Sequence, residues 1–115
     1  ASFTLAQASP PVQLLRDAGV ELVVASDANP GSAPTESLPL ALSLGVRNYG
    51  LSVAEALLGA TREAARSLGS DAGILRPGAP ADLAVWDLPH EAEIIQPWGT
   101  SRVQALLGRG RWLLS

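Results

Sequence analysis

A single short apolar run near the N-terminus most constrains how this chain can fold. Residues 20–25 are apolar apart from Glu21 and rich in the β-branched residue valine, a composition typical of a buried strand. The segments before and after the run favour helices. Because parallel strands need neighbours in the same sheet, one such strand among helices has no sheet of its own to join. The sequence therefore predicts part of an α/β fold, and we expect the chain to be the C-terminal part of a longer protein.

Helices are predicted on both sides of this run. Pro10 and Pro11 favour a helix start and Gly19 a helix end, so the first helix is expected before the strand. Apolar residues recur densely from Leu38 and predict a helix that ends near Gly45 to Gly50; it is apolar nearly all round, which is typical of a helix buried between other elements. Ser52 and Glu55 have the spacing of a capping box, which predicts a helix over 52–69 that ends at a glycine.

The last third of the chain changes character. Residues 75–81 contain two prolines and a glycine and predict a turn, and residues 81–87 then predict a strand. The apolar runs 102–107 and 111–114, separated by Gly-Arg-Gly, are typical of a β-hairpin. We therefore expect the end of an α/β domain followed by strands of a small β structure.

Composition excludes several classes of function. The 115 residues carry a formal net charge of −3 without a cluster of basic residues, which argues against binding to nucleic acid or to anionic membranes. There is no cysteine, so disulfides, thiolate metal ligands and a cysteine nucleophile are excluded. No signal peptide or membrane-spanning segment is recognisable. We expect a cytoplasmic protein that binds neither nucleic acid nor a membrane.

The loop at residues 26–32 holds the candidate functional residues. Asp27 follows directly on the predicted strand, and chemistry in parallel α/β folds gathers at the carboxyl ends of strands. Its carboxylate suits a metal ligand or a general base, while Asn29 and the backbone near Gly31 offer hydrogen-bond donors to a small polar ligand. The alternative is an ordinary turn, because Asp, Asn, Pro and Gly are also common turn residues.

Two patterns resemble a known family. The segment Asp-Ala-Asn-Pro-Gly at 27–31, followed by Pro34 and by Ser-Leu at 37–38, resembles the loop at the last barrel strand of imidazolonepropionases, members of the amidohydrolase superfamily. Residues 60–69, two later glycines and the run 81–87 resemble the closing helix of the wider superfamily and its return into a small β-sandwich. Together the patterns cover about residues 11–114.

The resemblance implies both a fold and a reaction. Residues 1–70 would be the last strand and helices of a metal-dependent (β/α)₈ TIM barrel, and residues 71–115 would be strands of a composite β-sandwich. Imidazolonepropionases open the ring of 4-imidazolone-5-propanoate to give N-formimino-L-glutamate. A zinc or iron ion lowers the pKa of its bound water, and the resulting hydroxide attacks the ring.

The same resemblance assigns roles to the loop. Asp27 would be a metal ligand and the catalytic group that carries a proton from water to the leaving nitrogen. Asn29, Gly31 and Ser32 would bind the substrate or its ring-opened product. The sequence departs from the family's more usual residues at two places, 43–47 and Glu63. These departures bear on the assignment of the substrate and not on the superfamily.

The remaining candidate residues are expected to be structural. His90, the only histidine, follows a proline in the last third of the chain and is expected to be a loop residue rather than a ligand. Asp82 is expected to hold a turn or strand-end hydrogen bond, and Glu91 and Glu93 to form a solvated face. The three tryptophans, at 86, 98 and 112, are expected to pack the core of the β-rich part.

A metal site needs three or four ligands, so Asp27 alone cannot hold a metal and this segment alone should be catalytically silent. Two other hypotheses stay open. The chain could belong to another amidohydrolase that acts on cyclic amide or amidine C–N bonds, such as an aminoacylase-like or deaminase member. It could also be a non-catalytic binding or assembly module with Asp27 in an ordinary turn. Whether the protein forms a homodimer stays open as well.

Overall fold

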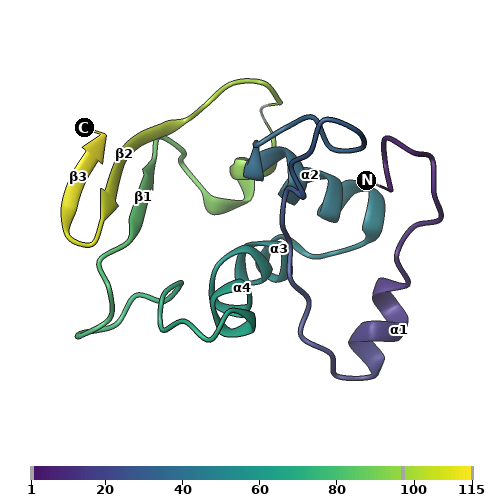
Figure 1. Ribbon diagram of the computed structural model, residues 1–115, viewed down its shortest axis with the longest axis horizontal. Helices are drawn as coiled ribbons and strands as arrows, with labels where there is room; N and C mark the ends of the chain where they lie inside the picture. The colour runs from purple at the N-terminus through teal and green to yellow at the C-terminus, as the bar shows by residue number, and fades with distance from the viewer. Residues whose placement is uncertain (1, 97, 115) are drawn as a thin grey trace.

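The computed structural model describes residues 2–96 and 98–114, which form a helical part followed by a small sheet (Figure 1). In chain order the elements are α1 (Val12–Asp17), α2 (Leu38–Tyr49), α3 (Val53–Ala60), α4 (Arg62–Ser67), β1 (Leu83–Trp86), the 3₁₀ helix η1 (Glu91–Ile95), β2 (Val103–Gly108) and β3 (Arg111–Leu114). The three strands form one antiparallel sheet in the order β1-β2-β3. This sheet lies at one end of the molecule, away from α1.

The first two helices confirm the sequence predictions. α1 lies between the proline pair and Gly19, and α2 begins after Ser37, whose Oγ accepts a hydrogen bond from Leu40 N–H at 3.3 Å. Gly50 directly follows the last residue of α2, and its left-handed φ of 78° is a conformation that glycine adopts without steric cost.

The prediction of one helix over 52–69 is correct at its start, but the structure has two helices there instead of one. Both hydrogen bonds of the Ser52–Glu55 capping box are present, and Gly69 lies just beyond the last helix with a φ of 66°. However, the helix breaks at Thr61, which has φ −122° and ψ −90° and separates α3 from α4. The Thr61 hydroxyl donates to the carbonyl of Leu57 at 2.7 Å, a local bond that competes with the helical pattern.

The predicted strand at 20–25 is extended but joins no sheet within the described residues, so that prediction needs correction. The physical reason is the absence of a neighbouring strand: the segment lies against α3, and Val24 N–H donates to the carbonyl of Gly59 at 3.0 Å. Exposure nevertheless alternates along residues 22–26, with every second residue partly buried. That period of two is the pattern of a strand with two distinct faces.

The core joins the helical part to the 3₁₀ helix. Ile94 and Ile95 of η1 are buried together with residues of α1, α2, α3 and the α2–α3 connection; the buried cluster is Val12, Leu42, Leu51, Ala56, Ile94 and Ile95. Leu22 and Val24 of the extended segment pack against this cluster. The segment that ends at Asp27 is therefore attached to the core through its even-numbered side chains.

The predicted hairpin at the end of the chain is present. β2 and β3 pair through a turn in which Arg109 N–H donates to Asp82 Oδ1 at 2.6 Å, which is the strand-end bond expected of Asp82.

The prediction that all three tryptophans pack the core is confirmed only in part. Trp86 packs against the core, but Trp98 and Trp112 are 51% and 64% exposed. Trp112 lies on β3, an edge strand of the sheet that is exposed at all four of its residues.

An ion pair ties α1 to the start of α3. Arg16 donates to both carboxylate oxygens of Glu55, at 2.7 and 2.9 Å, while the same carboxylate accepts from Ser52 N–H at 2.7 Å. These bonds, with Arg16 contributing most, lower the pKa of Glu55 from its ordinary 4.5 to about 2.

We expect this ion pair to stabilise the fold at neutral pH and to be lost in acid. Because the folded-state pKa is depressed, the contribution is complete above pH 4.5 and declines as the pH falls towards 2. Glu55→Gln should lower the unfolding temperature at pH 7, and this difference should shrink below pH 4.5. Thermal unfolding followed by circular dichroism across this range measures it, with exposed Glu93→Gln as the control. A difference that is independent of pH would contradict the account.

Candidate functional site

Asp27 lies where the extended segment turns into a loop, as the sequence predicted for a candidate catalytic residue. Its side chain is exposed, and its backbone has a left-handed φ of 51°. Asp is among the few residues other than glycine that adopt this conformation with some frequency. The segment thus changes direction at Asp27 itself.

Asn29 organises the loop that follows. Its Nδ2 group donates to the Asp27 carbonyl at 2.7 Å and to Ser32 Oγ at 3.2 Å, and its Oδ1 accepts from the backbone N–H groups of Gly31 and Ser32 at 3.0 and 2.8 Å. The backbone of Asn29 also exchanges two hydrogen bonds with Ala33, at 2.9 and 3.3 Å. The structure therefore brings the four predicted residues, Asp27, Asn29, Gly31 and Ser32, into one closed loop.

The N-terminal segment also reaches this loop. The Thr4 hydroxyl donates to the carbonyl of Ser32, although the two residues are 28 positions apart. Residues 2–4 thereby lie beside the candidate site, a contact that local sequence patterns could not indicate.

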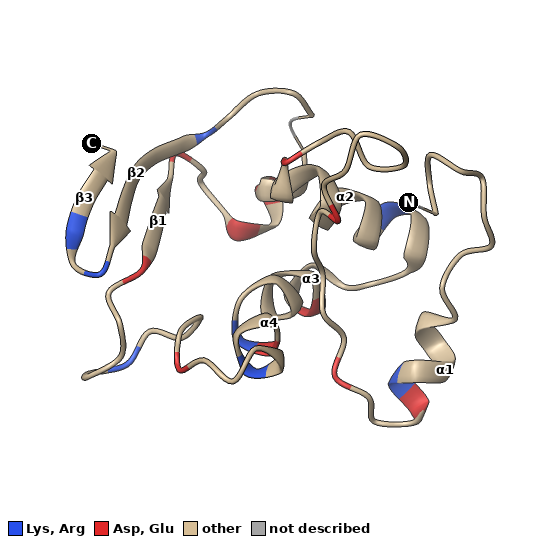
Figure 2. Cartoon of the chain, in the orientation of Figure 1, with Lys and Arg blue, Asp and Glu red and all other residues tan. Residues whose placement is uncertain are grey.

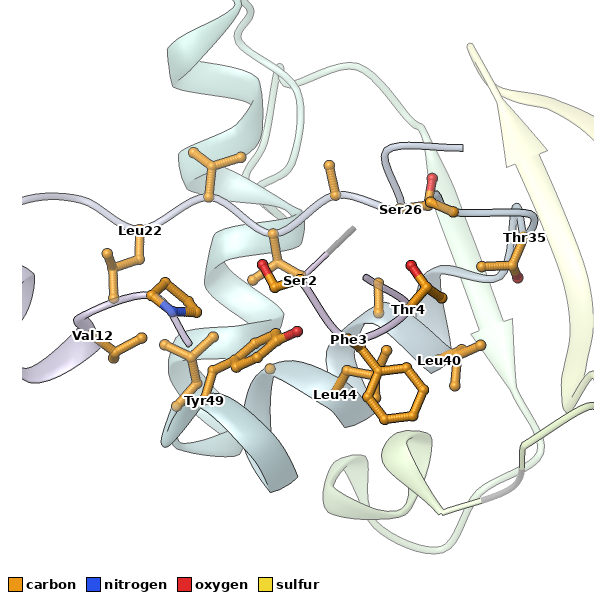
Figure 3. A pocket seen from close by; sticks show the side chains of 18 of the residues that line it. Ser2, Phe3, Thr4, Val12, Leu22, Ser26, Thr35, Leu40, Leu44 and Tyr49 are labelled. Atoms are coloured by element: carbon orange, nitrogen blue, oxygen red, sulfur yellow. The ribbon is translucent and has the colours of Figure 1, made fainter. Parts of the chain in front are cut away.

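A mostly apolar cavity of about 500 Å³ lies beside the extended segment, between it, the N-terminal segment and α2 (Figure 3). Ser26 and Thr35 are at one end, and Val12, Leu22 and Tyr49 are towards the other. Its lining contains no carboxylate and no imidazole among the described residues, and Asp27 and Asn29 are not part of it. The cavity suits apolar side chains rather than acid–base chemistry, and it borders the candidate site through Ser26, Thr4 and residues 33–35.

The donor set for a metal is incomplete. Within residues 2–96 and 98–114, no three His, Cys, Asp or Glu side chains gather closely enough to hold a metal ion. His90 is a loop residue, as expected: its side chain is 64% exposed, and its Nδ1 accepts from Ala92 N–H at 3.0 Å at the start of η1. The residues of this segment therefore do not fit a metal site by themselves, and Asp27 is the one candidate ligand that they offer at the loop.

The described charged residues are spread over several elements. Figure 2 shows acidic and basic positions dispersed along the chain, several of them in opposite-charge pairs. Glu91 and Glu93 are exposed, as predicted. Of the helices in the described part of the chain, none is both long and apolar enough to span a membrane.

Two buried polar groups were missed by the sequence analysis. Ser43 on α2 is fully buried, and its Oγ accepts from Trp98 Nε1 at 2.7 Å and from Arg47 Nε at 3.2 Å. Glu63 is buried between Arg62 and Arg66. A serine between leucines of a helix is a recognisable feature, but its partner Trp98, 55 residues away, is not.

Comparison with known proteins agrees with the two sequence patterns. The model of the amidohydrolase family matches residues 4–113. The chain is 44% identical over 112 residues to an imidazolonepropionase of Paracoccus denitrificans. This alignment covers 96% of the present chain and 28% of that protein. It is 51% identical over 96 residues to an imidazolonepropionase of Ruegeria pomeroyi, covering 82% of this chain and 24% of that protein. The chain thus spans about a quarter of the length of these relatives. Because the family match covers nearly all of its residues, the chain belongs to the amidohydrolase family.

Proposed function

We propose that this chain supplies the last quarter of an imidazolonepropionase, a hydrolase that opens the ring of 4-imidazolone-5-propanoate to N-formimino-L-glutamate. The observation that carries the proposal is the position of Asp27, exposed at the end of an extended segment and followed by a loop closed by Asn29. The similarity to imidazolonepropionases of several bacteria supports the choice of substrate.

In this proposal residues 1–70 complete a (β/α)₈ barrel, and residues 71–115 complete a small β-sandwich. The period-two exposure of residues 22–26 supports the first assignment, because such a segment has two faces to cover. The exposed apolar residues of β3 support the second, since Trp112 and Leu113 are 64% and 72% exposed and would be covered by further strands.

Asp27 would provide one carboxylate ligand to a zinc or iron ion, and residues outside this segment would provide the other ligands. The support is the chemistry of the donor: a carboxylate is a common zinc ligand, and catalytic sites combine it with histidines. When bound, such an ion polarises the water or the substrate.

The residues of this chain would then act on the proton and on the substrate. During hydrolysis the oxygen of water bonds to the ring carbon, and the C–N bond breaks. An Asp27 carboxylate oxygen accepts the proton that the water loses and returns it to the leaving nitrogen. The substrate would lie against the loop of Asn29, Gly31 and Ser32. The polar groups of this loop suit a small polar molecule better than the apolar lining of the cavity does.

Turnover by the complete enzyme tests the proposal. We expect it to convert 4-imidazolone-5-propanoate to N-formimino-L-glutamate, with a larger kcat/KM than for other cyclic amides or for acylated amino acids. The product is measured by mass spectrometry and the loss of substrate by absorbance. A larger kcat/KM for another C–N substrate would identify a different amidohydrolase, and a metal-free protein without turnover would favour the binding module.

A further inference from the structure

The N-terminal turn, residues 2–6, is a compact unit beside α2. It is closed by its own backbone, since Gln7 N–H donates to the Ser2 carbonyl at 3.0 Å. The Phe3 side chain lines the apolar cavity together with Leu44 of α2 (Figure 3). The turn therefore has a defined place in the fold before it meets the loop of the candidate site.

Thr4, in the middle of this turn, connects it to the candidate site. In Figure 3, Thr4 lies on the side of the cavity where Ser26 and Thr35 are found. Its hydroxyl donates to the Ser32 carbonyl, which belongs to the peptide between Ser32 and Ala33. Because a hydrogen bond to a carbonyl restrains the whole planar peptide, Thr4 holds the backbone of the loop at Ser32.

The Ser32 hydroxyl is weakly held by comparison. It lies 3.2 Å from Asn29 Nδ2 and 3.3 Å from Asn29 Oδ1, whereas hydroxyl-to-oxygen bonds are usually about 2.7–2.8 Å long. Ser32 is also only partly buried. A polar ligand can therefore replace these long contacts, and the place at which it meets the hydroxyl depends on the backbone that Thr4 restrains.

We infer that Thr4 is a positioning residue of the candidate site: its hydroxyl holds the Ser32 peptide so that the Ser32 hydroxyl meets the bound substrate. This inference deepens the proposed function and rests on it, because it takes Ser32 as a substrate contact. The roles proposed for Asp27, Asn29 and Gly31 stay as they are. The N-terminal turn thereby becomes part of the substrate site, although no sequence pattern marked it.

Kinetics of the complete enzyme with 4-imidazolone-5-propanoate test the role of Thr4. Thr4→Val keeps the shape and removes the hydroxyl, so we expect KM to rise about 2- to 10-fold, the size of one ordinary hydrogen bond, at unchanged kcat. Thr4→Ser keeps the hydroxyl and should recover most of this loss. Thr100→Val, at an exposed threonine before β2, is the matched control.

An unchanged KM in Thr4→Val, or a lower kcat at constant KM, would overturn the positioning role. A Thr4→Ser variant as impaired as Thr4→Val would do the same. If Thr4→Val does not fold, Thr4→Ala removes the same hydroxyl and is judged by the same change in KM.

A double-mutant cycle separates positioning from direct contact by Thr4. Ser32→Ala should raise KM, and adding Thr4→Val to it should raise KM no further, because Thr4 acts through the Ser32 hydroxyl. Additive effects would show that Thr4 acts independently of Ser32 and would overturn the inference. An unchanged KM in Ser32→Ala would overturn it as well.

A measurement without substrate keeps this inference apart from the proposed function. Hydrogen exchange of the amides of residues 29–33, followed by mass spectrometry, reports how firmly the loop is held. We expect faster exchange in Thr4→Val than in the wild type, Thr4→Ser or Thr100→Val. Equal exchange in Thr4→Val and the wild type would overturn the positioning role, whereas a wild-type enzyme inactive on 4-imidazolone-5-propanoate, with exchange as expected, would overturn the proposed function and leave the hold of Thr4 on the loop.

Discussion

Replacing Asp27 by asparagine is expected to lower kcat of the complete enzyme by about 10²- to 10⁴-fold, the range that general acid–base groups contribute. Asparagine has nearly the same shape and also tolerates the left-handed φ of 51°, so the loop should keep its conformation. The change therefore removes the charge and the proton acceptor without rebuilding the backbone. Steady-state kinetics with 4-imidazolone-5-propanoate measure the effect.

The matched control is Asp71→Asn, which alters an exposed carboxylate in the turn that follows α4. It should leave kcat unchanged, because Asp71 is exposed and its ion-pair partner among the described residues, Arg76, is distant at 3.9 Å. Equal activity of Asp27→Asn and the wild type would remove Asp27 from the catalytic site and leave it as an ordinary turn residue.

Adding a methyl group at Gly59 is expected to destabilise the chain by about 1–3 kcal/mol, as overpacking of a closely packed contact does. A Cβ there would lie 2.7 Å from the carbonyl oxygen of Leu22 and 3.2 Å from Cγ2 of Val24. Neither α3 nor the extended segment can yield easily, because Val24 N–H is bonded to the Gly59 carbonyl itself. The expected loss exceeds the gain of up to about 1 kcal/mol that alanine gives over glycine in a helix.

Gly45→Ala provides the comparison, since it makes the same substitution inside α2. Its Cβ would meet the end of the Leu51 side chain at 3.0 Å, and that side chain can rotate. Denaturant unfolding of both variants should show the larger loss of stability for Gly59→Ala. A Gly59→Ala variant as stable as Gly45→Ala would show that α3 does not rest on the extended segment through this glycine.

Local chemistry explains which elements could be predicted. The capping box of Ser52 and Glu55 and the hairpin around residues 108–110 depend on residues close in sequence, and both are present. The closed loop at Asp27 follows from the same kind of chemistry, because an asparagine before Pro-Gly forms such turns.

The corrected elements depend on distant contacts. Residues 20–25 have the composition of a strand, but a strand is defined by its neighbour, and the described chain provides α3 instead. The break at Thr61 lies where Gly73 approaches the chain closely: a Cβ at Gly73 would lie 2.5 Å from the Thr61 carbonyl oxygen. Burial of Trp112 likewise requires a surface opposite β3 that no local pattern specifies.

The most direct measurement is a crystal structure of the complete metal-bound enzyme, with anomalous scattering to locate and identify the ion. The account predicts an Asp27 Oδ atom within about 2.0–2.2 Å of a zinc ion, the usual distance for a carboxylate ligand. A metal ion held entirely by other residues, with the Asp27 carboxylate directed into solvent, would contradict it.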